Sequence, residues 1–173
     1  MVAVVAGAGL GLERSSGFVL GSNGQLGQAS VGRAGGNVYV NAASGNLVIQ
    51  STDEMLFGLG QDVDVGRAYN SLGATAWQTS QARRITGLTG TVNTAGSTVT
   101  RIAADGSDVV YAYDATLGAY VAKEGGGGYD RLTFSGSGST WTWTDGASRT
   151  VELYDGANGG RITRSTDKNG NAL

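Results

Sequence analysis

The feature that most constrains this chain is a turn signal that recurs about every ten residues between short runs of alternating residues. The clearest example is TWTWTDGASRTVELYD, residues 140–155, in which Asp145 and Gly146 separate two period-two runs. An Asp-Gly pair readily takes the positive φ angles that a tight hairpin needs. No stretch of helical period is long enough for a βαβ unit. The pattern predicts an all-β chain of antiparallel hairpins, a meander that forms a sandwich-like or an open solenoid sheet.

Other segments repeat this pattern and suggest how the chain is divided. NVYVNAASGNLVIQS and STVTRIAADGSDVVYAYD each contain two short strands around a turn, the second one at Asp105-Gly106. Residues 1–35 are instead rich in glycine, and each glycine inside a helix costs about 1 kcal/mol relative to alanine. We therefore expect a short strand within Val2–Ala6 and an irregular leading or capping segment up to residue 35. An all-β domain is expected over 36–173.

Composition excludes several classes of function. The chain has no Cys, His or Pro, so it lacks thiolate chemistry, the usual general base and proline-based turns. Its net charge is −2, which argues against nucleic acid as a partner. No apolar run approaches the ~20 residues of a membrane span. The start, MVAVVAGAGLGLERSS, has no Lys or Arg before its apolar run, so a standard cleaved signal peptide is not expected.

The tail, TDKNGNAL, contains a candidate metal site. Asp167, Asn169 and Asn171 occupy the first three oxygen positions of a calcium loop. The glycine, however, falls inside this triad at position 170, and Ala172 stands where the calcium loop requires a glycine. The alternative is an Asn-Gly turn without a metal.

Two patterns raise an enzymatic hypothesis. Asp62 and Asp64 lie about 7 Å apart on one strand face, and paired carboxylates can hydrolyse glycosides. Alternating Asp and Val is equally typical of a half-solvated strand. Gly7-x-Gly9 resembles the start of a dinucleotide fingerprint, but Leu12 replaces its third glycine and no helix is expected to follow. With no His to activate a serine, we predict a protein that is not an enzyme and needs no cofactor.

The aromatic residues leave two interpretations open. Trp77, Trp141 and Trp143 could form a sugar-stacking platform or pack inside the protein. Trp141 and Trp143 share one strand face, so they are either buried together or exposed together. If they are exposed, they are candidate glycan contacts, and the alternative function is a carbohydrate-binding or adhesion module.

Residues 45–71, GNLVIQSTDEMLFGLGQDVDVGRAYNS, resemble the opening region of bacterial YD-repeat proteins, also called RHS-repeat proteins. In that family a Gly-Asn-Leu-Val segment, an Asp, a Gly-rich turn and Arg-x-Tyr-Asn introduce the repeat array. The matching residues here are Gly45, Asn46, Leu47, Val48, Asp53, Gly58, Gly60, Arg67, Tyr69, Asn70 and Ser71. Residues 154–173 are similar to one partial YD repeat, through Tyr154, Asp155, Gly160, Arg161, Asp167, Asn169, Gly170 and Asn171.

The resemblance implies a structural role. In the family, repeats wind as β-hairpins into a large hollow shell that encloses a C-terminal toxin or effector, or displays segments at the cell surface. This chain would then be the cap and first wall segment of a secreted or cell-surface bacterial protein. Its partners would be downstream repeats of the same parent chain and an encapsulated effector. Because hairpins leave unpaired strand edges, edge-to-edge self-association is also expected.

Overall fold

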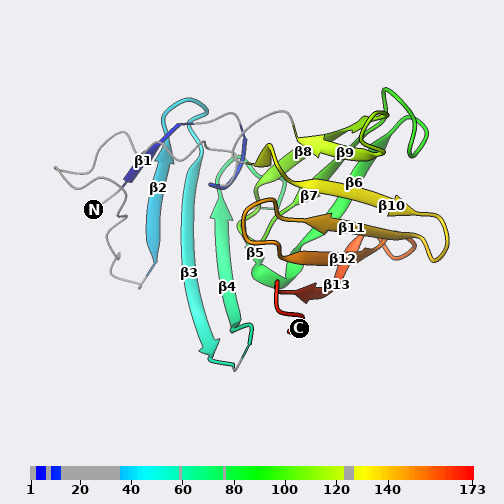
Figure 1. Ribbon diagram of the computed structural model, residues 1–173. Helices are drawn as coiled ribbons and strands as arrows, with labels where there is room; N and C mark the ends of the chain where they lie inside the picture. The colour runs from blue at the N-terminus through cyan, green and yellow to red at the C-terminus, as the bar shows by residue number, and fades with distance from the viewer. Residues whose placement is uncertain (1–2, 7–8, 13–35, 59, 76, 123–126) are drawn as a thin grey trace.

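The computed structural model describes residues 3–6, 9–12, 36–58, 60–75, 77–122 and 127–173. Its strands form a five-stranded sheet and an eight-stranded closed barrel, which lie side by side (Figure 1). The all-β prediction is confirmed. The chain passes from the sheet to the barrel through a short 3-10 helix, η1 (Ser80–Ala82). The predicted division at residue 36 stays a prediction, since most of the segment before it lies outside the described residues.

The five-stranded sheet is built in chain order. Its strands are β1 (Ala3–Val5), β2 (Asn37–Asn41), β3 (Leu47–Leu56), β4 (Val63–Asn70) and β5 (Trp77–Thr79). The strand expected within residues 2–6 is β1, which pairs in parallel with β2, whereas the other three pairs are antiparallel. The long β3–β4 ribbon extends well beyond the other strands of its sheet (Figure 1).

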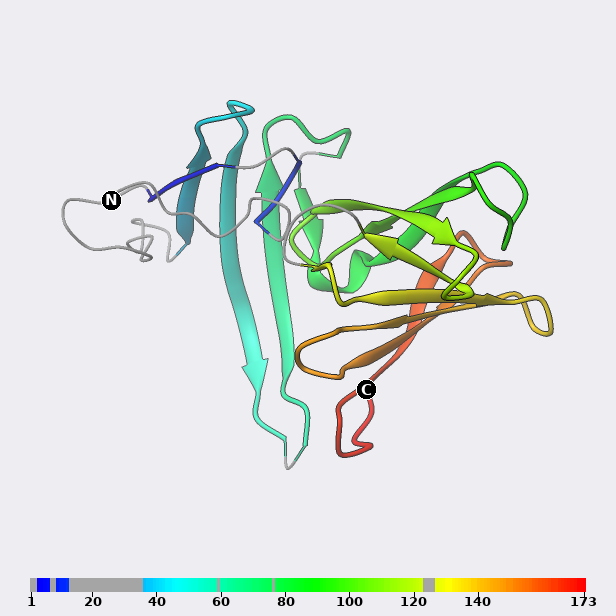
Figure 2. The ribbon, with the colours of Figure 1, turned by 45° about the horizontal axis from the view of Figure 1, so that its top comes forward.

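The barrel is an up-and-down meander closed on itself. Its strands are β6 (Arg84–Thr89), β7 (Thr98–Ile102), β8 (Asp108–Asp114), β9 (Ala119–Ala122), β10 (Arg131–Ser135), β11 (Thr140–Thr144), β12 (Val151–Asp155) and β13 (Arg161–Thr166). The predicted hairpin meander is confirmed, and β13 also pairs with β6, which turns an open sheet into a barrel. This closure has one registered pair, Arg161 opposite Arg84. Figure 2 shows the barrel strands crossing the direction of β3 and β4.

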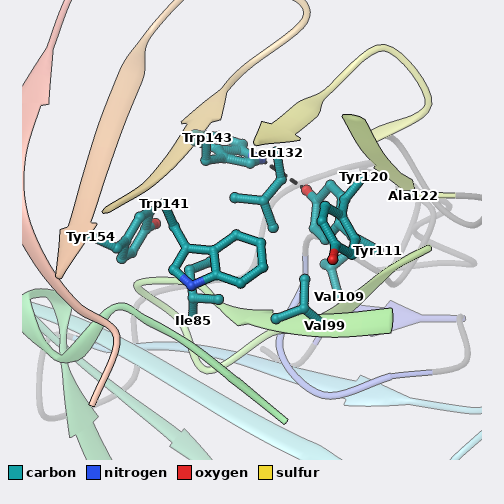
Figure 3. Packing of buried hydrophobic residues seen from close by; sticks show 10 residues of the cluster. All are labelled: Ile85, Val99, Val109, Tyr111, Tyr120, Ala122, Leu132, Trp141, Trp143 and Tyr154. Carbon is teal, nitrogen blue, oxygen red and sulfur yellow. Dashed lines mark hydrogen bonds between the residues drawn. The ribbon is translucent and has the colours of Figure 1, made fainter. Parts of the chain in front are cut away.

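Side chains fill the barrel interior. Ten buried residues form its core: Ile85, Val99, Val109, Tyr111, Tyr120, Ala122, Leu132, Trp141, Trp143 and Tyr154 (Figure 3). The rings of Tyr120 and Trp141 meet edge-on with centroids 5.3 Å apart, and Phe134 packs 4.8 Å from Trp141. An eight-stranded barrel is just wide enough to be filled by its own side chains, which is what the alternation of inward residues achieves here.

In this chain without proline, aspartate side chains stabilise many of the turns between strands. Asp145 illustrates the rule, because its Oδ1 accepts hydrogen bonds from the backbone N–H groups of Ala147 at 2.8 Å and Ser148 at 2.6 Å. Five aspartates, which we call the turn aspartates, accept the N–H two residues further on: Asp105, Asp114, Asp145, Asp155 and Asp167. The predicted turn at Asp105-Gly106 is confirmed, with Gly106 at φ of 80°, whereas the turn that begins at Asp145-Gly146 runs to Thr150 and has its positive φ at Arg149. Each carboxylate satisfies N–H groups that the hairpin ladder leaves unpaired.

Candidate functional site

The family-motif residues Asn46 and Asn70 meet at one corner of the five-stranded sheet. They lie together because β3 begins beside the end of β4, and both are buried. Asn46 Nδ2 donates a hydrogen bond to Asn70 Oδ1 at 2.9 Å, and Asn46 Oδ1 accepts one from Leu72 N at 3.2 Å. Gly45 precedes Asn46 with φ of 77°, a conformation that favours glycine. The motif therefore forms a satisfied polar cluster.

Asn70 also ties the sheet to the barrel. Its Oδ1 accepts a hydrogen bond from Gly11 N at 2.7 Å, and its Nδ2 donates to the carbonyl of Asp105, in the β7–β8 turn, at 2.8 Å. Gln78 on β5 reinforces this contact, since its Nε2 donates to the carbonyl of Ala103 at 2.7 Å. We call Asn46, Asn70, Gln78 and Asp105 the sheet–barrel junction. Side-chain amides that donate hydrogen bonds across the junction in this way favour one relative orientation of the two units.

The motif residues Arg67 and Asp53 form an ion pair on the opposite face of the sheet. A β-bulge between Thr52 and Glu54 makes Asp53 the extra residue of β3. Arg67 binds it through two contacts, Nε to Oδ2 at 2.5 Å and Nη2 to Oδ1 at 2.7 Å. Hydrogen bonding and the charge of Asp53 raise the pKa of Arg67. The pair is largely exposed, so its main effect is to hold the Arg67 side chain in place.

The predicted partial repeat begins with residues that hold the barrel together. Tyr154 is buried in the core, and Asp155 makes the following turn. Gly160 has φ of 67°, and a Cβ there would lie 1.9 Å from the carbonyl oxygen of Ile85. That closeness arises because Ile85 N donates a hydrogen bond to Gly160 O at 2.8 Å. Glycine at this position therefore lets β6 close onto β13.

The tail residues Asp167, Asn169 and Asn171 form a turn, and calcium binding there stays a prediction. Asp167 Oδ1 accepts hydrogen bonds from Asn169 N at 2.8 Å and Asn171 N at 2.9 Å, and Oδ2 accepts one from Asn171 Nδ2. The hydrogen bond from the Asn171 side chain is the largest reason that the pKa of Asp167 is lowered. Gly170 has φ of 88°. The described residues contain no group of three or more acidic side chains arranged to hold a metal.

After this turn the chain pairs with β13 through an isolated antiparallel bridge, Ala172 opposite Thr166. Ser165 and Leu173 exchange backbone hydrogen bonds of 3.0 and 2.9 Å. Because β12 occupies the other edge of β13, this pairing uses the same edge as β6, whose neighbour Arg83 accepts a hydrogen bond from Ile162 N at 3.1 Å. The tail and β6 therefore lie end to end along a shared edge.

The structure corrects the glycan-contact prediction for Trp141 and Trp143. They share a face as expected, but that face is the barrel interior, where they are 5% and 6% exposed. Trp143 Nε1 donates a hydrogen bond to the hydroxyl of Tyr111 at 2.9 Å (Figure 3). Their rings pack against barrel residues, and only an edge of Trp141 reaches a pocket, of about 380 Å³, that it lines with Ile85 and Phe134.

Sequence reasoning missed a buried charge network inside the barrel. The side chains of Arg101 and Glu152 are each 3% exposed and pair at 2.9 Å, and Arg83 also binds Glu152. Arg101 Nε donates to the Tyr154 hydroxyl at 3.0 Å, and its guanidinium lies 3.6 Å over the ring of Trp143. Burial alone would raise the pKa of Glu152, but the two arginines and Tyr154 outweigh it and lower the pKa. The sequence did contain an indication of this network, because period-two alternation places Arg101 on the same face of β7 as Val99, which points into the barrel.

The remaining sequence candidates lie at the start of β4 and in the N-terminal segment. Asp62 and Asp64 are both exposed, but only Asp64 lies in β4; Asp62 precedes the strand and accepts a hydrogen bond from Gly58 N. Gly7 of the glycine fingerprint lies outside the described residues. Leu12, at the position of its third glycine, donates its N–H to Asp105 Oδ2 at 2.7 Å. This contact joins the N-terminal segment to the same junction as Asn70.

Comparison with known proteins gives no assignment. A scan against models of protein families, a search of curated proteins and a search of solved structures each found no match to this chain. Within the described residues, no helix has the length and apolar character needed to cross a membrane.

Proposed function

We propose that this chain is the structural opening region of a bacterial YD-repeat protein, in which it caps the array and forms the first wall segment of a β-shell. The proposal rests on the order of the motif residues, and their contacts suit it. Asn46 and Asn70 join the N-terminal segment, the sheet and the barrel, while the repeat-like residues from Tyr154 onward build the closing strand. We assign it no catalytic role and a secreted or cell-surface location.

The observation that carries the proposal is the shared edge of β13. Leu173 pairs with Ser165, so a strand that continues this pairing runs along β13 toward Arg83, the neighbour of β6. The β6–β13 closure has one registered pair and two flanking backbone hydrogen bonds, in contrast to the five registered pairs between β11 and β12. A downstream repeat would thus find an edge on which pairing has already begun and whose other occupant has few registered pairs with β13.

In this arrangement the N-terminal sheet caps the repeat array, and the C-terminal strand β13 joins it to the next repeat. The N-terminal sheet and its junction with the barrel supply the atypical end unit that repeat architectures require. The β13 edge supplies the side on which downstream repeats of the parent chain add. An effector enclosed by the shell would lie further along the same parent chain.

Tandem extension tests the proposal. A second copy of residues 154–173 is appended after Leu173, and amide hydrogen exchange is followed by mass spectrometry. We expect the appended copy to be protected and the amide of Ile85 to exchange faster, because the added strand replaces β6 on β13. The control carries the same twenty residues in scrambled order. If the appended repeat exchanges as fast as the scrambled copy, the proposal is wrong.

A further inference from the structure

A surface pocket of about 310 Å³ lies where the sheet passes into the barrel. Trp77 and Thr79 of β5 form one side, Thr75 lies in the preceding turn, and Arg67 and Arg84 contribute the charged groups. A pocket that combines an aromatic ring, cations and hydroxyls, with no carboxylate among its described lining residues, suits an anionic polar ligand.

Trp77 gives this pocket a fixed aromatic face. It is 48% exposed, whereas Trp141 and Trp143 are almost fully buried. Its ring is braced by Tyr69, with centroids 5.3 Å apart, and by the guanidinium of Arg67 at 5.7 Å from its centroid. Since Asp53 in turn holds Arg67, the exposed ring is oriented before any ligand arrives. Rigid exposed aromatics of this kind lose little conformational entropy on binding.

Arg84 supplies a cation that forms no ion pair with any described residue, although Asp108 lines a neighbouring pocket with it. It lies directly opposite Arg161 across the β6–β13 pairing, and like charges in that position destabilise a sheet. In the described part of the chain, neither guanidinium forms an ion pair or a side-chain hydrogen bond. Asp155 is opposite Arg161 on β12, but its oxygens accept hydrogen bonds from Ala157 and Asn158 in its own turn.

We propose that this pocket binds a carboxylated sugar. The sugar ring stacks on Trp77, its carboxylate pairs with the Arg84 guanidinium, and the hydroxyls of Thr75 and Thr79 bind ring hydroxyls. The bound carboxylate also reduces the repulsion between Arg84 and Arg161. The site differs from the one predicted at Trp141 and Trp143, and it does not depend on the proposed role in a repeat shell.

Tryptophan fluorescence tests this directly, because Trp77 is the exposed one of the three tryptophans. The intact chain is titrated with trigalacturonate, with neutral galactotriose and with inorganic phosphate, and iodide quenching is measured alongside. We expect trigalacturonate alone to shift the emission and protect it from iodide. Galactotriose binding as tightly as trigalacturonate, or phosphate giving the same protection, would overturn the assignment of a carboxylated sugar.

Substitutions of Arg84 test whether its guanidinium binds the carboxylate. Arg84→Gln should weaken trigalacturonate binding about tenfold or more, since a hydrogen-bonded charge is lost. Arg164→Gln removes a similarly exposed charge from β13 outside the pocket and should leave the affinity unchanged. Arg84→Lys keeps the charge without the two-pronged geometry and should give an intermediate affinity. Equal affinity for Arg84→Gln and the unmodified chain would refute the site. The tandem extension experiment measures whether an added strand pairs with β13 and does not involve a sugar. The repeat-shell proposal and the sugar-binding proposal can therefore fail separately.

Discussion

Neutralising Glu152 should strongly destabilise the barrel. Glu152→Gln keeps the side-chain volume but removes the carboxylate with which Arg101 and Arg83 both pair inside the protein. Removing one partner of a buried ion pair costs about 3–5 kcal/mol, because the remaining charge loses its compensation in a low dielectric. For a chain of this size, each kcal/mol lowers the Tm by about 2–4 °C. The expected fall in Tm is therefore about 6–20 °C.

The assay is thermal unfolding by near-ultraviolet circular dichroism, which reports on Trp143 in the same network. Arg164→Gln is the matched control, since it removes a charge from an exposed position and should change the Tm by less than about 2 °C. A double-mutant cycle with Arg101→Met should show a coupling of about 1 kcal/mol or more. A fall below about 2 °C for Glu152→Gln, or strictly additive effects, would refute the reasoning.

Three further predictions follow from the turns, the junction and the barrel closure. Three turn aspartates have a lowered pKa in the folded protein, so their stabilisation is complete above their ordinary pKa of 3.8 and is lost as the pH falls below it: Asp145, Asp155 and Asp167. The Tm should therefore fall below about pH 4, because Asp130, whose pKa burial raises, opposes this trend only above that range. A Tm that rises as the pH falls from about 4 to 2 would contradict this. Asn70→Ala should cost about 1–3 kcal/mol in urea unfolding, because it leaves the buried groups of the junction unpaired, whereas the exposed Asn169→Ala should cost almost nothing. Gly160→Ala should speed amide exchange at Ile85 by forcing β6 off β13, while Gly159→Ala, with φ of 70° and open space around its Cβ, should show only the left-handed backbone penalty of about 1–2 kcal/mol. Equal exchange in these two glycine variants would show that the close contact is unimportant.

Local features of this fold could be predicted from the sequence. The Asp145-Gly146 turn and the alternation of Trp141 and Trp143 were readable, because turn chemistry and period-two alternation act within a few residues. Barrel closure could not be predicted in this way, because it depends on the pairing of Arg84 in the first barrel strand with Arg161 in the last one. Without closure, the face that carries the two tryptophans could not be identified as the interior.

For the candidate sites too, local features could be predicted from the sequence and long-range contacts could not. Asn46 and Asn70 were singled out by family resemblance, but their shared contact with the β7–β8 turn required the packing of the sheet against the barrel. The charge network was missed because Arg101 and Glu152 come from strands that are neither adjacent in sequence nor paired. Trp77 and Arg84 meet in one pocket because η1 turns the chain from the sheet into the barrel.

The central claim is that the β13 edge accepts another strand when β6 releases it, and light scattering during size exclusion tests this most directly. The unmodified chain is compared with an Arg84→Cys/Arg161→Cys variant, whose disulfide locks β6 to β13 in a protein that has no other cysteine. Thr133→Cys/Thr142→Cys, which joins β10 to β11, is the control lock. We predict concentration-dependent oligomers for the unmodified chain and the control lock, a monomer for the oxidised β6–β13 lock, and recovery of oligomers on reduction. A monomer for the unmodified chain at every concentration, or oligomers that the lock leaves unchanged, would contradict the claim.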